Sequence, residues 1–298
     1  MILHTENGVQ IRGDLIKSAT ARSDMAPVPV TLEAEIRVLD DAAKALLAVG
    51  KKIQLAGGDW LTIVKSSYGE GLQVQGAHKM AAVKIVALLD ACLPVTYVRQ
   101  RAVIKESATL LQIYRACGAS LQAVDADLPV DRFTCLVGEA PSFHLARALQ
   151  EQGGVVRWKD GRLKFFRLQD LFKQQAAISL NKDAFEDTDS GFLERHEIPF
   201  FFSLNVAGAA VLGNQSKARK ARFSPFKNQQ QLNNMTRCLV TKKSIRVMFD
   251  YRLGAGDVVE VDGVGALVVV TAAHVFQSGT DGDAADQYSR LWLAKLEN

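Results

Sequence analysis

One segment in the middle of the chain, residues 132–172, constrains the fold more than any other part of the sequence. A short β run at 133–137 is followed by glycine and proline and then by the apolar spacing of a helix. Ser142 stands where a helix N-cap belongs, and the pair Gly153 and Gly154 ends the helix. The segment therefore predicts a strand followed by an amphipathic helix, whose apolar stripe is Phe143, Leu145, Ala146 and Leu149.

A β-hairpin is predicted directly after this helix. The β runs 155–158 and 162–166 flank the turn Lys159-Asp160-Gly161, and glycine at that place is typical of a tight hairpin turn. The strand–helix–hairpin unit contains no evident catalytic constellation. Its value is architectural.

The sequence before this unit favours strands. Residues 28–38 alternate between apolar and polar side chains, which predicts a half-buried strand with Val28, Val30, Leu32, Ala34, Ile36 and Val38 on one face. A short helix is expected at 41–49. Further strands are expected at 53–55, 61–65, 71–75, 83–89 and 96–104.

A second region begins with a predicted amphipathic helix at 105–117, which Gly118 ends and in which Ala108, Leu111 and Tyr114 share a stripe. This region closes near Leu180. Strand patterns then return at 198–206, 235–241, 244–249, 257–261, 266–275 and 288–296. The polar segment 214–234 is interpreted as a long loop, which inside a compact domain is often an interaction element.

Composition limits the function classes. Hydrophobic residues make up 48% of the 298 residues and charged residues 23%, as in ordinary soluble proteins. The net charge of +4 is too small to argue for nucleic acid by itself. No apolar run reaches the roughly 18–20 residues that span a bilayer, and no signal-peptide pattern opens the chain. We therefore expect no membrane-spanning segment and assembly in the cytoplasm.

Candidate catalytic and metal-binding residues are sparse. His274 follows Thr-Ala-Ala as in trypsin-like proteases, but no serine elbow follows it, so a strand-end histidine is expected. Glu139 and Glu151 stand at opposite ends of one predicted helix, too far apart for a glycosidase pair. The histidines lack metal-site spacing and the usual phosphate loops are absent. No catalytic residue, metal site or cofactor is predicted, and the four dispersed cysteines (Cys92, Cys117, Cys135 and Cys238) are expected to be reduced and buried.

Two groups remain as candidate protein-interface residues. Three consecutive phenylalanines place Phe200 and Phe202 on one face of a strand and Phe201 on the other, so both faces need cover from the same chain or from a partner. The basic residues of the polar segment allow three interpretations: a solvated loop, a protein-docking loop or a nucleic-acid contact. These basic residues are Lys217, Arg219, Lys220 and Arg222.

Taken in order, these pieces resemble the hub proteins of phage tails, a family that includes the trimeric baseplate hub of contractile phages and the hub portion of type VI secretion valine-glycine-repeat spike proteins. The resemblance rests on a helix from Ser107 to Cys117, a second helix ending in Glu-x-Gly at 151–153, the hairpin, and the closing stretches 252–259, 266–274 and 287–296. The sequence departs from the family at 217–234, a segment that has no counterpart in the family. No fused needle or lysozyme domain is expected, so any spike is expected to be a separate protein.

The resemblance implies a β-rich α+β fold: two tube-like β-barrel domains flanking an α/β insert, with boundaries at 1–103, 104–180 and 181–298. It implies a structural virion protein without enzymatic activity, a homotrimer whose six barrels match the sixfold tail tube above and the threefold spike below. The expected partners are the tail tube ring, the spike, other baseplate subunits and, transiently, DNA passing along the channel during genome ejection. Strands 28–38 and 266–275 are expected at edges that continue into a neighbouring barrel.

Two alternatives from other classes stay open. A tail-associated hydrolase, such as a peptidoglycan hydrolase or peptidase, rests only on His274, Glu139 and Glu151. A nucleic-acid-binding phage protein rests on the basic segment 217–222 and would lose affinity steeply with salt.

Overall fold

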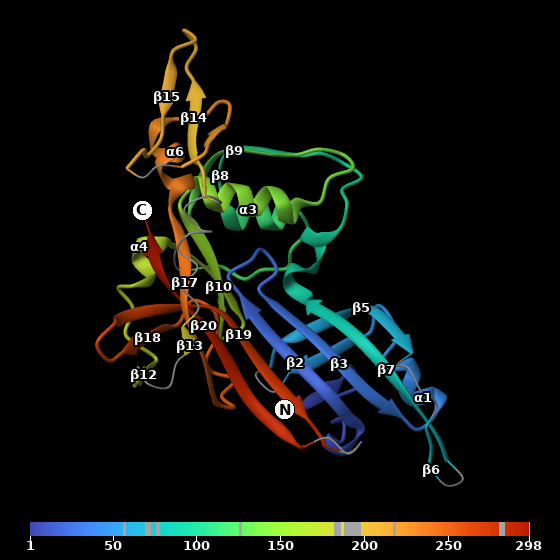
Figure 1. Ribbon diagram of the computed structural model, residues 1–298. Helices are drawn as coiled ribbons and strands as arrows, with labels where there is room; N and C mark the ends of the chain where they lie inside the picture. The colour runs from blue at the N-terminus through green and yellow to red at the C-terminus, as the bar shows by residue number, and fades with distance from the viewer. Residues whose placement is uncertain are drawn as a thin grey trace.

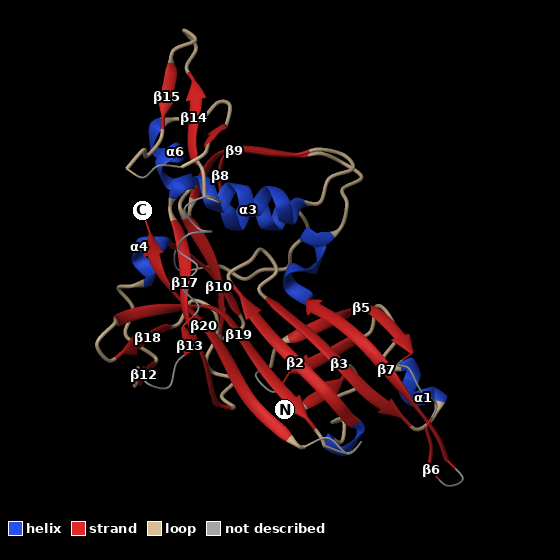
Figure 2. Ribbon diagram, viewed as in Figure 1, coloured by secondary structure: helices blue, strands red, loops and turns tan. Residues whose placement is uncertain are grey.

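The computed structural model describes residues 1–55, 58–68, 73–75, 78–124, 127–181, 186–187, 198–216, 219–279 and 284–297. Two β-lobes flank a mixed insert, and a single 13-stranded sheet runs through both lobes (Figure 1; Figure 2). The predicted fold class, a β-rich α+β fold with two tube-like barrel domains around an α/β insert, is confirmed. The three domain boundaries stay predictions. Among the described helices none has the length and apolar character needed to cross a bilayer.

The first lobe contains the strands drawn in blue and cyan, in the spatial order β1-β4-β5-β7-β3-β2 (Figure 1). The period-two pattern at 28–38 is confirmed in β3, where Leu32, Ala34 and Ile36 point into the core. The lobe consists of β1 (Leu3–Thr5), η1 (Gly13–Leu15), β2 (Ile16–Asp24), β3 (Val30–Val38), α1 (Asp41–Ala45), β4 (Lys52–Leu55), β5 (Trp60–Tyr68), β6 (Gln73–Gln75), β7 (His78–Leu89) and the 3-10 helix η2 (Asp90–Thr96).

The strand predicted at 96–104 is wrong for most of its length, because the chain leaves η2 as an irregular segment and strand structure resumes only at Val103. The backbone of Arg99 makes its hydrogen bonds with a turn of the insert instead of a strand. Its N–H donates to the Glu139 carbonyl at 2.9 Å, and its carbonyl accepts from Gly138 at 2.9 Å. A backbone that is already paired in this way has no need of a ladder partner.

The insert begins with a strand where the sequence predicted a helix. Residues 103–109 pair with β9 across an antiparallel ladder, and the helix α2 starts only after Thr109. The Thr109 hydroxyl accepts from the Gln112 N–H while the Gln112 side chain accepts from the Thr109 N–H, a capping box that fixes the start. The insert consists of β8 (Val103–Thr109), α2 (Leu110–Ala116), β9 (Pro129–Cys135), α3 (Pro141–Glu151), β10 (Gly154–Lys159), β11 (Arg162–Arg167) and α4 (Leu168–Leu171).

Helix α3 follows the prediction with two corrections. Its N-cap is Ala140 and not Ser142, because Pro141 occupies the first helical turn, where its missing N–H costs nothing. Leu145 and Leu149 are buried as expected, but Phe143 is 70% exposed and Ala146 is also exposed. The buried stripe uses Ala148 instead.

The predicted hairpin is confirmed in β10 and β11. Its turn residues Asp160 (φ 54°) and Gly161 (φ 71°) both lie in the left-handed region, as a two-residue hairpin turn with primed geometry requires.

The second lobe contains the strands from residue 238 onward, drawn in orange and red, and two short strands that precede them in the sequence (Figure 1). The two strands predicted at 235–241 and 244–249 are one strand, β17, interrupted by a register shift between Thr241 and Lys243. Met235 belongs to a helix instead. The lobe consists of β12 (Ile178–Leu180), β13 (Glu186–Asp187), β17 (Cys238–Met248), β18 (Val258–Val261), β19 (Gly265–Gln277) and β20 (Asp286–Glu297).

The lobes join through β2 and β19, which pair antiparallel over seven residue pairs from Thr271–Asp24 to Gln277–Ser18. The centre of the large sheet is therefore β3-β2-β19-β20. The expectation that 28–38 and 266–275 are edge strands is wrong, since β3 pairs with both β2 and β7, and β19 with both β2 and β20. Both β3 and β19 are therefore paired on both sides with strands of the same chain.

Candidate protein interface

A small three-stranded sheet projects away from the large sheet at the top of Figure 1. It has the order β15-β14-β16, with β14 (Phe200–Leu204), β15 (Ala210–Leu212) and β16 (Ala221–Phe223), and helix α6 (Gln229–Thr236) packs against it. The long loop predicted at 214–234 is therefore wrong in part, because β16 and most of α6 lie within it. Asn228 and Gln231 form a capping box that starts the helix.

Phe201 holds the projecting sheet and α6 together. Its side chain is buried against Leu232, Met235 and Val211, the small apolar core of this unit. Gly213 lies so close to this core that an added Cβ would meet the Phe201 carbonyl oxygen at 2.6 Å. This glycine is needed for the close approach of the two backbones.

The opposite face of the sheet is apolar and open. Because side chains alternate along a strand, Phe200 and Phe202 point away from Phe201. Phe202 stands opposite both Leu212 of β15 and Phe223 of β16, and the two aromatic ring centroids lie 5.4 Å apart. Phe200 and Phe202 are half-buried, whereas the remaining members are exposed. We call this the outer face; it consists of Phe200, Phe202, Leu204, Leu212 and Phe223.

The basic residues predicted to dock a partner are spread over this unit. Arg222 pairs in register with Phe201, so it lies on the side of the sheet that faces α6 and not on the outer face. Lys220 is exposed. Arg219 is half-buried and donates from Nη1 to the Thr236 carbonyl at 3.3 Å. Lys217 lies outside the described residues.

A groove of about 700 Å³ separates α3 from the projecting sheet. Arg147, Arg222 and Arg237 line it, and the exposed ring of Phe143 lies at its wall. Among the described residues that line this groove, none is acidic. We call it the arginine groove. Its charge and its aromatic ring suit an acidic segment of a partner protein.

Sequence reasoning missed Phe143, Arg147 and Arg237 as parts of this surface. Phe143 and Arg147 come from α3, far from the basic segment in the sequence, and Arg237 is the C-cap residue of α6. The one sequence signal for this surface is the helical spacing, because Phe143 and Arg147 are four residues apart and share one helix face.

The candidate catalytic residues lack the geometry of a catalytic site. His274 is 2% exposed, and its Nδ1 lies 2.8 Å from the Oγ of the fully buried Ser289. The rings of Phe249 and Tyr251 cover it at centroid distances of 5.8 and 5.1 Å. Ser289 has no exposed surface, so its hydroxyl is not presented as a nucleophile at the surface.

Glu139 and Glu151 flank α3, so their backbones stand about 18 Å apart at 1.5 Å per residue, beyond the spacing of a glycosidase pair. Glu151 instead forms ion pairs with Lys227 at 2.7 Å and with Arg147 at 3.3 Å.

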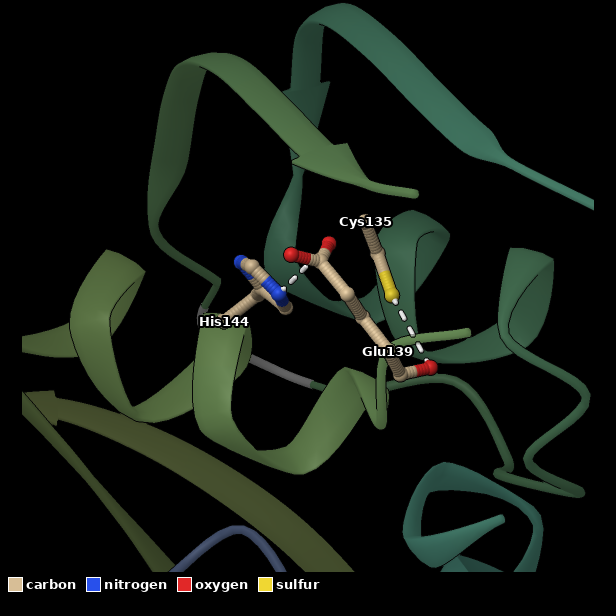
Figure 3. A group of neighbouring side chains, drawn as sticks. All are labelled: Cys135, Glu139 and His144. Atoms are coloured by element: carbon tan, nitrogen blue, oxygen red, sulfur yellow. Dashed lines mark hydrogen bonds and ion pairs between the residues drawn. The ribbon is translucent and has the colours of Figure 1, made fainter. Parts of the chain in front are cut away.

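One mixed cluster has donors suited to a metal ion. Cys135, Glu139 and His144 offer ligand atoms that all lie within 4.8 Å of one another (Figure 3). The sequence did not predict this cluster, because the spacings among histidines and among cysteines were considered separately and the cluster joins one cysteine, one glutamate and one histidine. Cys92, Cys117 and Cys135 are buried thiols, whereas Cys238 is half-buried. Burial raises the pKa of the Cys92 thiol to about 12.

No protein-family model and no curated protein matches the sequence. Solved structures do match the fold along nearly the whole chain. A tail protein from Neisseria meningitidis MC58 superposes with a TM-score of 0.65 at 11% identity, covering 99% of this chain and 95% of its own. The 43 kDa tail protein of prophage MuSo2 from Shewanella oneidensis gives 0.64 at 13%, covering 98% and 96%.

A third match is an E. coli component of the type VI secretion system, described as structurally similar to the T4 bacteriophage tail proteins gp27 and gp5. It gives a TM-score of 0.59 at 11% identity, covering 98% of this chain and 76% of its own. The resemblance predicted from the sequence is thus confirmed at the level of fold. This chain has the hub-like fold that phage tail proteins share with components of type VI secretion.

Proposed function

We propose that this chain is a structural subunit of a phage-type tail, a homotrimeric hub that joins a sixfold tail tube to a threefold spike. The observation that carries the proposal is the β2–β19 pairing, which places two β-lobes side by side in one continuous sheet. Three copies then present six lobes around one axis, which matches a sixfold ring. The fold likeness to tail proteins supports the same role.

The central strands supply a suitable channel wall. Along β2 and β19 the register pairs Thr20 with Val275 and Arg22 with Ala273, on the face opposite the buried Ala21 and His274. Neighbouring strands add Glu33 and Arg290 to this face, which therefore mixes both charges with small side chains. A polar wall of mixed charge lets DNA pass without binding it tightly, since phosphate affinity grows with net basic charge.

The outer face and the arginine groove are then the docking surfaces for neighbouring subunits. An exposed apolar sheet face on a projecting unit is typical of a protein interface. An acidic segment of a tube, spike or baseplate partner would fill the groove, with Arg147, Arg222 and Arg237 as contacts.

Mass measurement in solution tests the oligomer. Multi-angle light scattering should give three times 32.5 kDa, about 97.5 kDa, at micromolar protein. Co-incubation with the tube and spike proteins of the same tail should produce a larger complex. A chain that stays monomeric and joins neither partner would contradict the proposal.

Variants then separate the docking surfaces from the fold. Phe223→Asp on the outer face, and Lys217, Arg219, Lys220 and Arg222 changed together to Glu, should block assembly and leave the circular dichroism spectrum unchanged. Phe226→Asp is the matched control, because Phe226 is exposed but is not a member of the outer face. Normal particles from the outer-face or charge variants would refute the docking role.

A further inference from the structure

The corner between β9 and α3 gathers three different metal-ligating side chains. Cys135 is the last residue of β9, Glu139 lies in the turn, and His144 lies in the first turn of α3. His144 Nε2 lies 3.0 Å from Glu139 Oε2, and the Glu139 carboxylate lies between the imidazole and the cysteine side chain (Figure 3). The cysteine is buried, and the other two are half-buried at the surface of the insert.

The local backbone holds this corner in place. Gly138 has φ 86°, a left-handed conformation that lets the chain turn sharply between the cysteine and the glutamate. Glu139 Oε2 also accepts a hydrogen bond from the Leu136 N–H at 2.7 Å, which anchors the carboxylate to the turn. The His144 ring stands edge-on to Phe133 and Phe143 at centroid distances of 6.3 and 5.6 Å, which limits its rotation.

The spacing of the donors fits a tetrahedral zinc ion. Zinc bonds of about 2.0–2.3 Å to nitrogen, oxygen and sulfur give ligand–ligand edges of about 3.3–3.6 Å. The histidine–glutamate distance of 3.0 Å is already close to such an edge. The largest separation, at most 4.8 Å, exceeds it by about 1.2 Å, which a side-chain rotation of Cys135 or Glu139 closes without moving the backbone.

The donor chemistry selects zinc over the other common divalent ions. Thiolate and imidazole favour zinc, whereas magnesium and calcium require oxygen ligands. A thiolate and a carboxylate neutralise the two positive charges of the ion, so the occupied corner carries no net charge. We propose that Cys135, Glu139 and His144 form a three-ligand Zn²⁺ site that ties the end of β9 to the start of α3, with water in the fourth position.

Cobalt provides a direct test, because Co²⁺ replaces Zn²⁺ in such sites and gives a charge-transfer absorption band when bound to thiolate. The full-length protein, stripped with chelator, is titrated with Co²⁺ and then with Zn²⁺ as competitor. We expect a thiolate band at one Co²⁺ per chain, displaced by stoichiometric Zn²⁺ and unaffected by Mg²⁺. Absence of the band, or a band that Zn²⁺ does not displace, would overturn the site.

Matched variants locate the ligands. Cys135→Ser should abolish the band, whereas Cys238→Ser, at a cysteine outside the cluster, should keep it. His144→Asn and Glu139→Gln should each weaken Zn²⁺ affinity at least tenfold, whereas His4→Ala should not change it. Glu139→Gln retains an acceptor for the Leu136 N–H, so it tests ligation while preserving the turn. Equal Zn²⁺ affinity in wild type and all three cluster variants would also overturn the proposal, and neither outcome bears on whether the chain forms a trimer.

Discussion

The buried histidine of β19 makes the stability of this fold depend on pH in a calculable way. Burial lowers the pKa of His274 to about 4, against the opposing effects of a hydrogen bond to the Leu253 backbone and the charge of Asp250. Its ordinary value is 6.5. The folded chain therefore binds this proton less tightly than the unfolded chain, and stability is lost as the pH falls from 6.5 toward 4.

The magnitude follows from the two pKa values. The difference of about 2.5 pH units, from 6.5 to 4, corresponds to a maximum of about 3.4 kcal/mol at 1.36 kcal/mol per unit. Between pH 7.5 and pH 4.5 the loss is about 2.5 kcal/mol, because the unfolded histidine is then almost fully protonated and the folded one is mostly neutral. Burial raises the pKa of Asp59, and that carboxyl acts in the opposite sense, since its stabilising contribution is lost as the pH rises.

Urea unfolding of wild type and His274→Gln across this pH range isolates the histidine from Asp59 and the other acids. Glutamine fills much of the same space and can still bond to Ser289, but it does not titrate. We expect the difference in unfolding free energy between the two proteins to change by about 2.5 kcal/mol from pH 7.5 to 4.5. If the unfolding free energies of the two proteins changed in parallel with pH, the reasoning would be refuted, because His274 would then titrate alike in the folded and unfolded chains.

Two further substitutions test contacts that hold the insert to the second lobe and the projecting sheet to α6. Asp257→Asn removes the charge of a 4% exposed carboxylate that pairs with Arg157 and, at 3.1 Å, with Lys159. The unfolding free energy measured in urea should therefore fall by about 3–5 kcal/mol. A loss below 1 kcal/mol would mean that solvent already screens these ions. Phe201→Ala should destabilise the projecting sheet by about 3–5 kcal/mol and speed hydrogen exchange in β14 and α6, with exchange in β2 and β3 as the internal control. Unchanged exchange in β14 and α6 would show that the packing of the sheet on α6 does not depend on this ring.

Regular patterns predicted regular structure well. The alternation at 28–38 defined β3 and its buried face, and the Asp160-Gly161 turn defined the hairpin, because in both places the local preference and the tertiary packing agree. The helix predicted from residue 105 failed because side-chain periodicity over so few turns cannot separate a strand followed by a helix from one longer helix. The Thr109–Gln112 capping box was the local signal that marks the true start.

The surface of the candidate interface was less predictable. Phe200, Phe202 and Arg222 were identified from composition along one strand and one polar segment, but their faces depend on the parallel pairing of β14 with β16. That pairing joins residues 21 positions apart, such as Phe200 and Ala221, and no local rule sets its register. The arginine groove also needs α3, which comes from a different part of the chain.

A single strand of the insert, β10, binds both lobes. Successive side chains of β10 point to opposite sides, so Trp158 donates to Asp59 of the first lobe at 2.8 Å while Lys159 donates to Asp257 of the second at 3.1 Å. Tyr251 of the second lobe reaches the other oxygen of Asp59 at 3.2 Å, which closes the contact between the lobes. Asp257 is buried and Asp59 is half-buried, so sliding the insert against either lobe would leave a charge or a polar group without its partner. Because that cost opposes small displacements in both directions, the insert and the two lobes should move as one body, as the proposed role between a tube and a spike requires.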